Sequence, residues 1–242
     1  MARWVELATT NDGTRKSNED FVDRVKWYGK RRRVTLLVAC DGIGSRPDAS
    51  ACARGVGRAA LEHAVRFLKR RNSTRALGPS DATKLAKRLR NLKVTGVKEG
   101  SGTTFVLSLF DHKRHRAGYS LVTLWAGDSR AYLLDSSGGL HQLTSDHQSD
   151  ERRITRFYDG LGRVRGGDVD ASFYEVSSAP RAICLTTDGV HERCSPNELR
   201  EFMLYCITRK PRTEPQLSHY LTGFLARNIG DNYSMSLMYK TP

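Results

Sequence analysis

The stretch Val34-Thr35-Leu36-Leu37-Val38-Ala39-Cys40-Asp41-Gly42 decides the fold. Residues 34–40 form a nearly continuous apolar run with several β-branched side chains, which is typical of a strand that is buried on both faces. A carboxylate and a glycine follow at once, where the chain leaves the sheet. The sequence therefore predicts a central buried strand with a polar group at its end.

Outward from this strand, the sequence predicts blocks of strands and pairs of helices. Apolar residues recur at helical spacing in two segments after the central strand and in two more near the end of the chain. Helices that come in pairs after particular strands favour an α+β fold over alternating βαβ units. We expect helices at residues 49–68, 80–92, 196–207 and 214–227, strands at residues 3–9, 34–40, 103–110, 119–126, 129–134, 140–143, 171–177, 182–187 and 233–239, hairpin connections at residues 111–116 and 135–139, and a loop at residues 144–170.

The composition suits one soluble globular domain. Hydrophobic residues make up 38% of the 242 residues and charged residues 27%, which argues against a disordered tail protein. No apolar run approaches the roughly 20 residues that a membrane helix needs, and the first residues lack the apolar core of a signal peptide. Because the chain shows no internal repeat and no long linker, we expect a single domain over residues 1–242 that does not bind membranes.

The chain is strongly basic, with 40 Lys and Arg against 26 Asp and Glu, a net charge of +14. Basic clusters lie at residues 31–33, 69–71 and 84–90. Two interpretations stay open: solvated faces that keep the protein soluble, and surfaces that attract acidic partners. The chain has no zinc-finger spacing and its Trp residues do not interleave with the basic clusters, so we expect no sequence-specific nucleic-acid binding.

The five cysteines show no spacing typical of a zinc site. Cys40 and Cys184 lie inside apolar runs, and we expect both to be buried, reduced thiols. An odd number of cysteines without a disulfide pattern favours a cytoplasmic location.

Four carboxylates stand where an expected strand ends or begins, each beside a glycine. A single Asp-Gly pair is most often only a turn, but four such positions favour a common site. Carboxylates gathered at one rim repel one another and need a compensating cation, and an all-oxygen set selects a hard divalent ion, Mg²⁺ or Mn²⁺. The four are Asp41, Asp128, Asp188 and Asp231.

Seven blocks of sequence follow one another in the order of a known family. They are Gly13-Thr14-Arg15-Lys16-Ser17-Asn18-Glu19-Asp20, Val38-Ala39-Cys40-Asp41-Gly42-Ile43-Gly44, Ser101-Gly102-Thr103-Thr104, Ala126-Gly127-Asp128-Ser129-Arg130-Ala131-Tyr132-Leu133, Leu143-Thr144-Ser145-Asp146-His147, Leu185-Thr186-Thr187-Asp188-Gly189-Val190 and Asp231-Asn232. Together they resemble the metal-dependent protein phosphatases of type 2C, in particular the bacterial members. The resemblance implies the α+β fold of that family, a four-layer αββα sandwich of two antiparallel sheets flanked by helix pairs.

The same resemblance implies a metal role for five matched positions. Asp41 would bridge two ions, Mn²⁺ or Mg²⁺, and the carbonyl of Gly42 would bind the second ion. Asp188 and Asp231 would complete the first site. Glu19 would hold the second ion through a water.

Two further matched positions would complete the site. Asp20 would support the carboxylates that surround the second ion. Arg15 would hold the substrate phosphate, because a planar guanidinium binds two phosphoryl oxygens at once. Two ions that share a water lower its pKa and direct it at phosphorus, so the resemblance implies hydrolysis in one step, without a phosphoenzyme.

A third ion site stays open at Asp128 with Glu192. The resemblance implies a weaker metal there, but Glu192 is one methylene longer than the family's usual Asp. Asp128 has an alternative role as a turn residue bonded to backbone amides.

The chain departs from the family at two places. Ile43 stands where relatives have Met or His, so the leaving oxygen would take its proton from water, and His191 is more typical of a packed side chain than of an acid. The segment after His147, which we expect to hold its loop together, is short, because the block Arg153-Ile154-Thr155-Arg156 follows almost at once. We therefore expect a shortened flap and an open site.

These observations predict a metal-dependent protein-serine/threonine phosphatase that hydrolyses phosphomonoesters by direct attack of a metal-bridging water. The alternative is a weakly active or inactive regulator of the same fold that binds a phosphoprotein. The presence of the core acids and of Arg15 favours the enzyme. We expect phosphorylated proteins as substrates, and a monomer in the cytoplasm.

Overall fold

The protein is a sandwich of two facing antiparallel sheets, seen in a computed structural model that describes residues 3–14, 17–29, 32–71, 75–115, 118–225 and 231–241. The first sheet has the strand order β11-β6-β5-β3-β2. Its strands are β2 (Asp20–Gly29), β3 (Arg32–Asp41), β5 (Phe105–His115), β6 (Gly118–Ala126) and β11 (Asp170–Val176). The decisive apolar run is therefore β3, which pairs with β2 on one side and with β5 on the other.

The second sheet brings together strands from the two ends of the chain. Its order is β1-β13-β12-β7-β8. Its strands are β1 (Trp4–Asn11), β7 (Arg130–Leu134), β8 (Leu140–Gln142), β12 (Ala182–Thr186) and β13 (Tyr233–Lys240). A small third sheet at one end of the sandwich consists of β4 (Gly102–Thr103), β9 (Phe157–Asp159) and β10 (Val164–Arg165).

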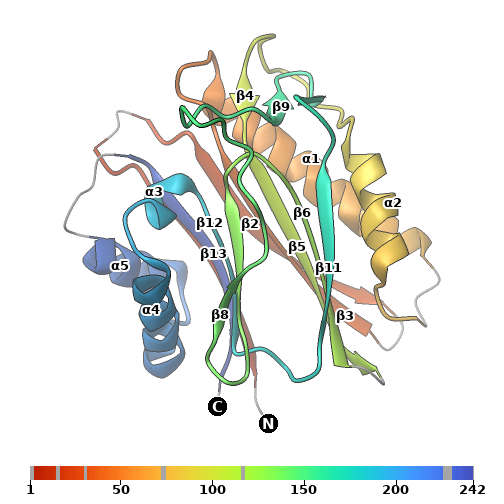
Figure 1. Cartoon of the computed structure of the whole chain (residues 1–242), viewed down its shortest axis with the longest axis vertical. Helices are drawn as coiled ribbons and strands as arrows, with labels where there is room; N and C mark the ends of the chain where they lie inside the picture. Colours follow the sequence, from red (N-terminus) through yellow and green to blue (C-terminus); the bar gives the residue numbers. More distant parts are fainter. Residues whose placement is uncertain are drawn as a thin grey trace.

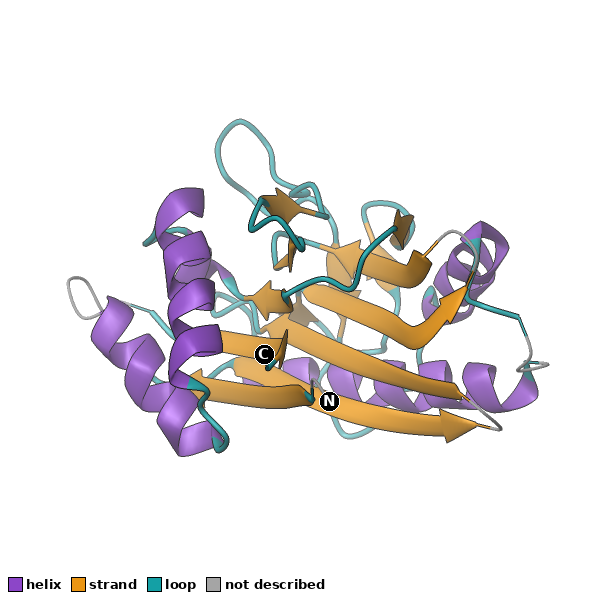
Figure 2. Ribbon diagram, turned by 90° about the horizontal axis from the view of Figure 1, so that it is seen from below, coloured by secondary structure: helices purple, strands orange, loops and turns teal. Residues whose placement is uncertain are grey.

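Helix pairs cover the two outer faces (Figure 1). The helices α1 (Ala49–Arg70) and α2 (Pro79–Leu89) lie on the first sheet, and α4 (Pro196–Arg209) and α5 (Glu214–Leu225) lie on the second. A one-turn helix, α3 (Asp188–His191), follows β12. Figure 2 shows the same layers from below, with helices on both flanks of the strands. The predicted four-layer α+β fold is confirmed.

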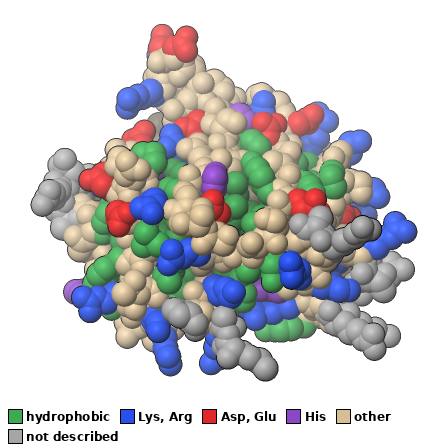
Figure 3. All heavy atoms as spheres, turned by 60° about the horizontal axis from the view of Figure 1, so that its bottom comes forward, with side chains coloured by type: hydrophobic (Ala, Val, Ile, Leu, Met, Phe, Trp, Pro, Cys, Tyr) green, Lys and Arg blue, Asp and Glu red, His purple; other side chains and the backbone are tan. Residues whose placement is uncertain are grey.

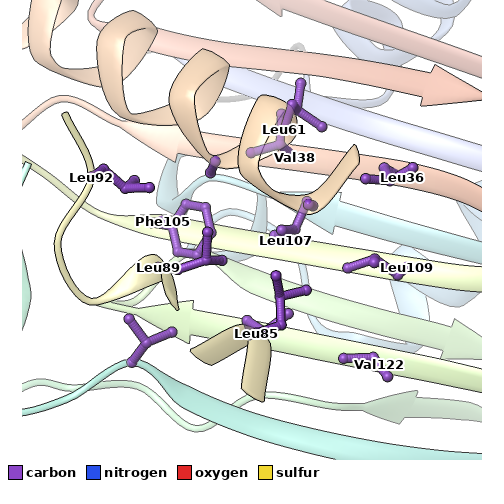
Figure 4. Packing of buried hydrophobic residues seen from close by; sticks show 14 of the residues in the cluster. Leu36, Val38, Leu61, Leu85, Leu89, Leu92, Phe105, Leu107, Leu109 and Val122 are labelled. Carbon is purple, nitrogen blue, oxygen red and sulfur yellow. The ribbon is translucent and has the colours of Figure 1, made fainter. Parts of the chain in front are cut away.

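Three apolar clusters hold the layers together. Under α1 and α2, the buried side chains include Leu36, Leu61, Leu85 and Phe105, which interdigitate between helix and sheet (Figure 4). Between the two sheets lies a second cluster, and a third lies under α4 and α5. Burial of apolar area on this scale is the main force that holds such layers together. In the described part of the chain, no helix is both long and apolar enough to cross a membrane.

Several predicted elements were wrong in detail. The segment between the first two predicted strands contains β2, and residues 144–170 contain β9 and β10 rather than only loop. Residues 111–115 continue β5 instead of forming a hairpin connection. The reason at Asp111 is tertiary: this charged residue is tolerated in a buried strand because it pairs with Arg32 at 2.5 Å, far away in the sequence.

The strands β1, β2 and β3 run from one end of the sandwich to the other. The register of β2 with β3 pairs Asp20 with Asp41 at one end and Gly29 with Arg32 at the other. Thr241 and Arg3 join the two chain ends by backbone hydrogen bonding at the latter end. The two ends of these strands therefore carry residues of opposite charge.

Candidate active site

Asp20 and Asp41 face each other across the β2–β3 pair. The backbone at Asp41 is held by β4 and its neighbours, because the Asp41 amide donates to Thr104 Oγ1 at 3.1 Å and the Thr104 amide donates to the Asp41 carbonyl at 2.8 Å. The end of the buried strand is thus fixed from both sides. Its carboxylate is placed by backbone that has little freedom to move.

Gly42 allows the backbone of two segments to meet. Its amide donates to the Glu19 carbonyl at 3.0 Å. A Cβ at this position would lie 2.6 Å from that carbonyl oxygen and 2.7 Å from the Ala49 carbonyl oxygen, closer than real Cβ atoms come. Only glycine fits here, and it lets the backbone of Glu19 and of Gly42 lie side by side.

Asp188 enters the site from the second sheet, as the first residue of α3. The residue before it, Thr187, donates from Oγ1 to Asp20 Oδ2 at 2.9 Å and accepts from the Ser234 amide at 3.1 Å. Gly189 packs so tightly on Asn232 that a Cβ would lie 1.8 Å from its carbonyl oxygen. Thr187 therefore joins Asp20 on the first sheet to Asp188 on the second.

Asn232 connects Asp231 to the segment that carries Glu19. Its Oδ1 accepts from the Glu19 amide at 2.9 Å, and its Nδ2 donates to the carbonyls of Asp12 and Ser17 at 2.8 and 3.2 Å. The Asn232 amide donates to Asp231 Oδ1 at 2.8 Å. This buried amide holds Glu19 and Asp231 near each other, although no role had been assigned to it from the sequence.

The carboxylates at this end repel one another. Burial raises the pKa of Asp41 well above its ordinary value, and the negative charges of Asp188 and Asp20 raise this pKa further. Burial also raises the pKa of Asp20 to about 7, against hydrogen bonds from Ser234 and Thr187 that lower it. We call Asp20, Asp41, Asp128 and Asp188 the acidic rim. These shifts mean that its members lie close enough to interact.

Asp128 adds a fourth carboxylate to the rim. It is 2% exposed, and burial followed by repulsion from Asp188 raises its pKa to about 6. Gln148 donates to Asp128 Oδ2 at 2.6 Å, whereas Asp128 Oδ1 has no hydrogen-bond partner among the described residues. Gln148 was missed in the sequence because nothing in its spacing indicates a contact with Asp128.

The loop that carries Gln148 is held by His147, as expected. The His147 amide donates to the Gly127 carbonyl at 3.0 Å, the Gly127 amide donates to His147 Nδ1 at 3.0 Å, and His147 Nε2 lies 2.9 Å from Asp170 Oδ2. The chain then turns back at once, because the Ser149 amide donates to the Arg153 carbonyl at 2.9 Å. The described segment 147–154 therefore forms a short turn and no long flap.

The structure relates the remaining residues considered from the sequence less directly to the acidic rim. Glu192 caps α3 through an amide that donates to the Asp188 carbonyl at 2.9 Å, but its side chain is exposed. Arg15 lies outside the described residues. His191 is buried with Nδ1 3.0 Å from Thr186 Oγ1, and burial followed by the charge of Arg130 lowers its pKa to about 3. Its imidazole is therefore neutral and engaged at neutral pH.

The donor set of the rim fits hard divalent cations. Its groups are all oxygen donors, they repel one another, and two of the buried oxygens, Asp20 Oδ1 and Asp128 Oδ1, lack hydrogen-bond partners within the described part of the chain. No three His, Cys, Asp or Glu side chains of the described residues are already gathered as a metal-binding group. A cation would therefore have to draw the carboxylates closer together than they lie without one.

Comparisons with known proteins agree with the fold. The family model described as "Protein phosphatase 2C" matches residues 7–173. No curated protein sequence matches the chain significantly. Among solved structures, a bacterial serine phosphatase is 20% identical with a TM-score of 0.67, covering 100% of this chain and 97% of that one.

Two other solved structures are similar over nearly the whole chain. The serine/threonine phosphatase Stp1 from Staphylococcus aureus is 20% identical with a TM-score of 0.65, covering 98% of this chain and 94% of that one. The catalytic domain of the serine threonine protein phosphatase PstP, solved in complex with two manganese ions, is 22% identical with a TM-score of 0.64, and both chains are covered completely. At these identities the likeness shows a common fold.

Proposed function

The chain belongs to the protein phosphatase 2C family, and from this premise we propose that it removes phosphate from phosphoserine and phosphothreonine with Mn²⁺ or Mg²⁺ as cofactor. Its enzyme class is protein-serine/threonine phosphatase. The observation that supports the metal-dependent reaction is the acidic rim, in which carboxylates from both sheets repel one another at one end of the sandwich.

Five positions would hold the ions. Asp41 would contact both, the Gly42 carbonyl and Glu19 would serve one, and Asp188 and Asp231 would serve the other. When bound, the ions would supply Lewis-acid activation of the attacking water. The backbone contacts of Gly42 and Asn232 support this assignment, because they bring Glu19 beside Asp41 and Asp231 beside Glu19.

The remaining residues would position the ester. Arg15 would bind phosphoryl oxygens and offset the charge of the transition state. Asp20, fixed by Thr187, would keep the rim in place. A third ion would use Asp128, whose Oδ1 is unpaired among the described residues, with Glu192 as the more distant ligand. His191 and His147 are engaged by Thr186 and Asp170, which favours water as the proton donor to the leaving oxygen.

We further propose that residues 1–242 act as one catalytic domain, as a monomer in the cytoplasm. Its substrates would be phosphorylated proteins. The absence of a long flap in the described segment 147–154 supports an open approach to the rim, and therefore little selection of substrates by a lid.

The test is hydrolysis of p-nitrophenyl phosphate and of a phosphothreonine peptide, with Mn²⁺, with Mg²⁺ and with EDTA. We expect turnover with either ion and none with EDTA. Asp188→Asn should lower kcat/KM by at least about a hundred-fold, since it removes a preorganised charge at the reacting centre. Glu62→Gln, a charge-neutralising change at a carboxylate that is 70% exposed on α1, is the matched control and should not alter turnover.

Two outcomes would contradict the proposal. Turnover that persists in EDTA would remove the metal from the mechanism. A folded chain that binds the phosphopeptide but does not hydrolyse it with either ion would favour the inactive regulator.

A further inference from the structure

A second pocket lies at the end of the sandwich opposite to the acidic rim. Its volume is about 540 Å³, within the range of sites that bind small molecules. Three strands and the α4–α5 connection contribute to its walls. Its lining residues are Arg3, Trp4, Val5, Glu6, Lys26, Tyr28, Arg33, Lys210, Arg212 and Thr241, and we call it the basic pocket.

The lining is strongly cationic. It has five Lys and Arg side chains and one carboxylate, a formal net charge of +4. The carboxylate, Glu6, has a side chain that is only 1% exposed and is already paired with Lys26 at 2.7 Å and with Arg33. The negative charge of Glu6 is thus neutralised within the protein, and the remaining cations leave an excess of positive charge toward the pocket.

Three of the cations have no acidic partner within the described part of the chain. No ion pair within the described residues involves Arg3, Lys210 or Arg212. All three are exposed at the pocket, where a ligand can reach them. Like charges gathered without counter-charges are unfavourable by themselves, which indicates a site for an anion.

The backbone that carries these cations is fixed. Lys210 ends α4 in the left-handed conformation with φ 54°, and its amide donates to the Cys206 carbonyl at 2.8 Å. The Arg212 amide donates to Gln216 Oε1 at 2.8 Å. Between them, the Pro211 carbonyl accepts from Tyr239 Oη at 2.6 Å, so the connection is held against β13. The cations are therefore presented from an ordered frame.

The surroundings of the pocket show the same excess of positive charge. His112, which lies beyond Arg33, hydrogen-bonds Thr35 Oγ1 at 2.8 Å. Burial, followed by the charges of Arg33 and Lys26, lowers the pKa of His112 to about 3. In Figure 3, Lys and Arg side chains gather over the lower half of the view, where hardly any Asp or Glu is visible.

We propose that the basic pocket binds a small, multiply charged anion of the phosphate class. A chain of phosphates offers several charged oxygens to converging Lys and Arg groups, and such charge-assisted hydrogen bonds are stronger than neutral ones. The ring of Tyr28, 67% exposed at the edge of the pocket, offers a face to a flat ring attached to the phosphates. The shared chemistry is that of inorganic polyphosphate and of nucleotides.

This pocket is distinct from the rim. Arg33 and Asp41 are eight residue steps apart along β3, which at the rise of a strand is about 26 Å. A ligand of a few phosphates cannot reach both ends. Occupation of the pocket is therefore an event separate from catalysis, and it is measurable whether or not the chain hydrolyses esters.

The test is isothermal titration of the full chain with sodium tripolyphosphate and, separately, with ADP, in buffer with EDTA, so that no divalent cation at the acidic rim binds the ligand. The variant Lys210→Gln/Arg212→Gln removes two of the unpaired cations. Lys84→Gln/Lys87→Gln removes two exposed cations of α2 and is matched in charge. Circular dichroism checks that each variant is folded, and sodium sulfate at equal ionic strength controls for screening.

We expect one saturable site in the wild type, a loss of affinity of at least about ten-fold in the pocket variant and less than about two-fold in the control. If the natural ligand carries a ring, Tyr28→Ala should weaken the binding of ADP and leave the binding of tripolyphosphate unchanged. If the natural ligand is inorganic, Tyr28→Ala should weaken the binding of neither probe. Equal weakening by both charge variants, or binding that the pocket variant does not alter, would overturn the proposal. So would a hexaglutamate peptide that binds the pocket more tightly than tripolyphosphate.

Discussion

The two ends of the sandwich are built from the same strands but differ in how their buried charges are compensated. At the acidic rim, Asp20, Asp41 and Asp188 repel one another, and this repulsion adds to burial in raising the pKa of Asp20 and of Asp41. At the other end, the buried Glu6 is compensated by Lys26 and Arg33. The contrast teaches that charge left uncompensated inside a protein marks a place for a ligand, whereas charge that is paired serves the fold.

The largest effect on stability should come from the paired charges. Arg32 and Asp111 form a buried ion pair at 2.5 Å with side chains 1% and 0% exposed. Arg32→Ala leaves Asp111 buried without its partner and should cost about 3–5 kcal/mol. Arg90→Ala breaks an exposed pair with Asp168 and should cost at most about 1 kcal/mol. Urea unfolding measures both; equal costs would mean that burial does not decide the value of the pair.

A smaller effect should appear as opposite pH dependences of the two ends. In EDTA, Asp20 binds a proton in the folded state up to about pH 7 but in the unfolded state only near its ordinary pKa of 3.8, so the stability that it contributes falls as the pH rises from about 4 to 7. The pKa of His112, lowered to about 3, stands below its ordinary 6.5, so its contribution falls as the pH drops below about 6.5.

Variants separate the two contributions. Asp20→Asn should remove the loss on the alkaline side, and His112→Gln should remove part of the loss on the acid side, each by a few kcal/mol at most. Urea unfolding from pH 4 to 8 in EDTA provides the comparison. A wild type and an Asp20→Asn variant with parallel pH profiles would show that Asp20 ionises normally.

The smallest effect on stability should distinguish carboxylates that are repelled by their neighbours from carboxylates that are stabilised by hydrogen bonds. Asp41→Asn should raise the stability of the metal-free protein by about 1 kcal/mol while it abolishes turnover, because it relieves repulsion at the rim. Asp135→Asn should lower the stability of the metal-free protein, since hydrogen bonds from Ser137 and His141 hold the pKa of Asp135 well below its usual range. The check is the midpoint of urea unfolding in EDTA. Destabilisation by both changes would refute the repulsion.

Much of the fold was predictable from the sequence because local patterns carry it. The apolar run at residues 34–40, the helical spacing at residues 49–68 and the strand ends at Asp41 and Asp188 all lie where the structure places them. The strand β2 was missed because its charged residues hide the alternation. Arg24 and Lys26 belong to it and pair with Glu214 and Glu6, which are distant in sequence. Such partners are visible only after folding.

The candidate site was predicted for a different reason. Its acids stand beside glycines at strand ends, and the resemblance to one family gives each acid a role. Thr187, Gln148 and Asn232 were not assigned roles, because each works by bridging segments that no spacing relates. The one signal in the sequence was a position next to a predicted site aspartate, since Thr187 precedes Asp188 and Asn232 follows Asp231. The roles of these acids, of Arg15 and of Glu192 stay predictions.

The continuity of β3 from Arg33 to Asp41 has a consequence for how such proteins diversify. Because side chains alternate along a strand, the insertion or deletion of one residue within it would turn every later side chain to the opposite face. A length change near Arg33 would thus point the carboxylate of Asp41 into the wrong layer. During evolution, residues at either end of the sandwich can be substituted, whereas insertions and deletions are confined to the connecting loops.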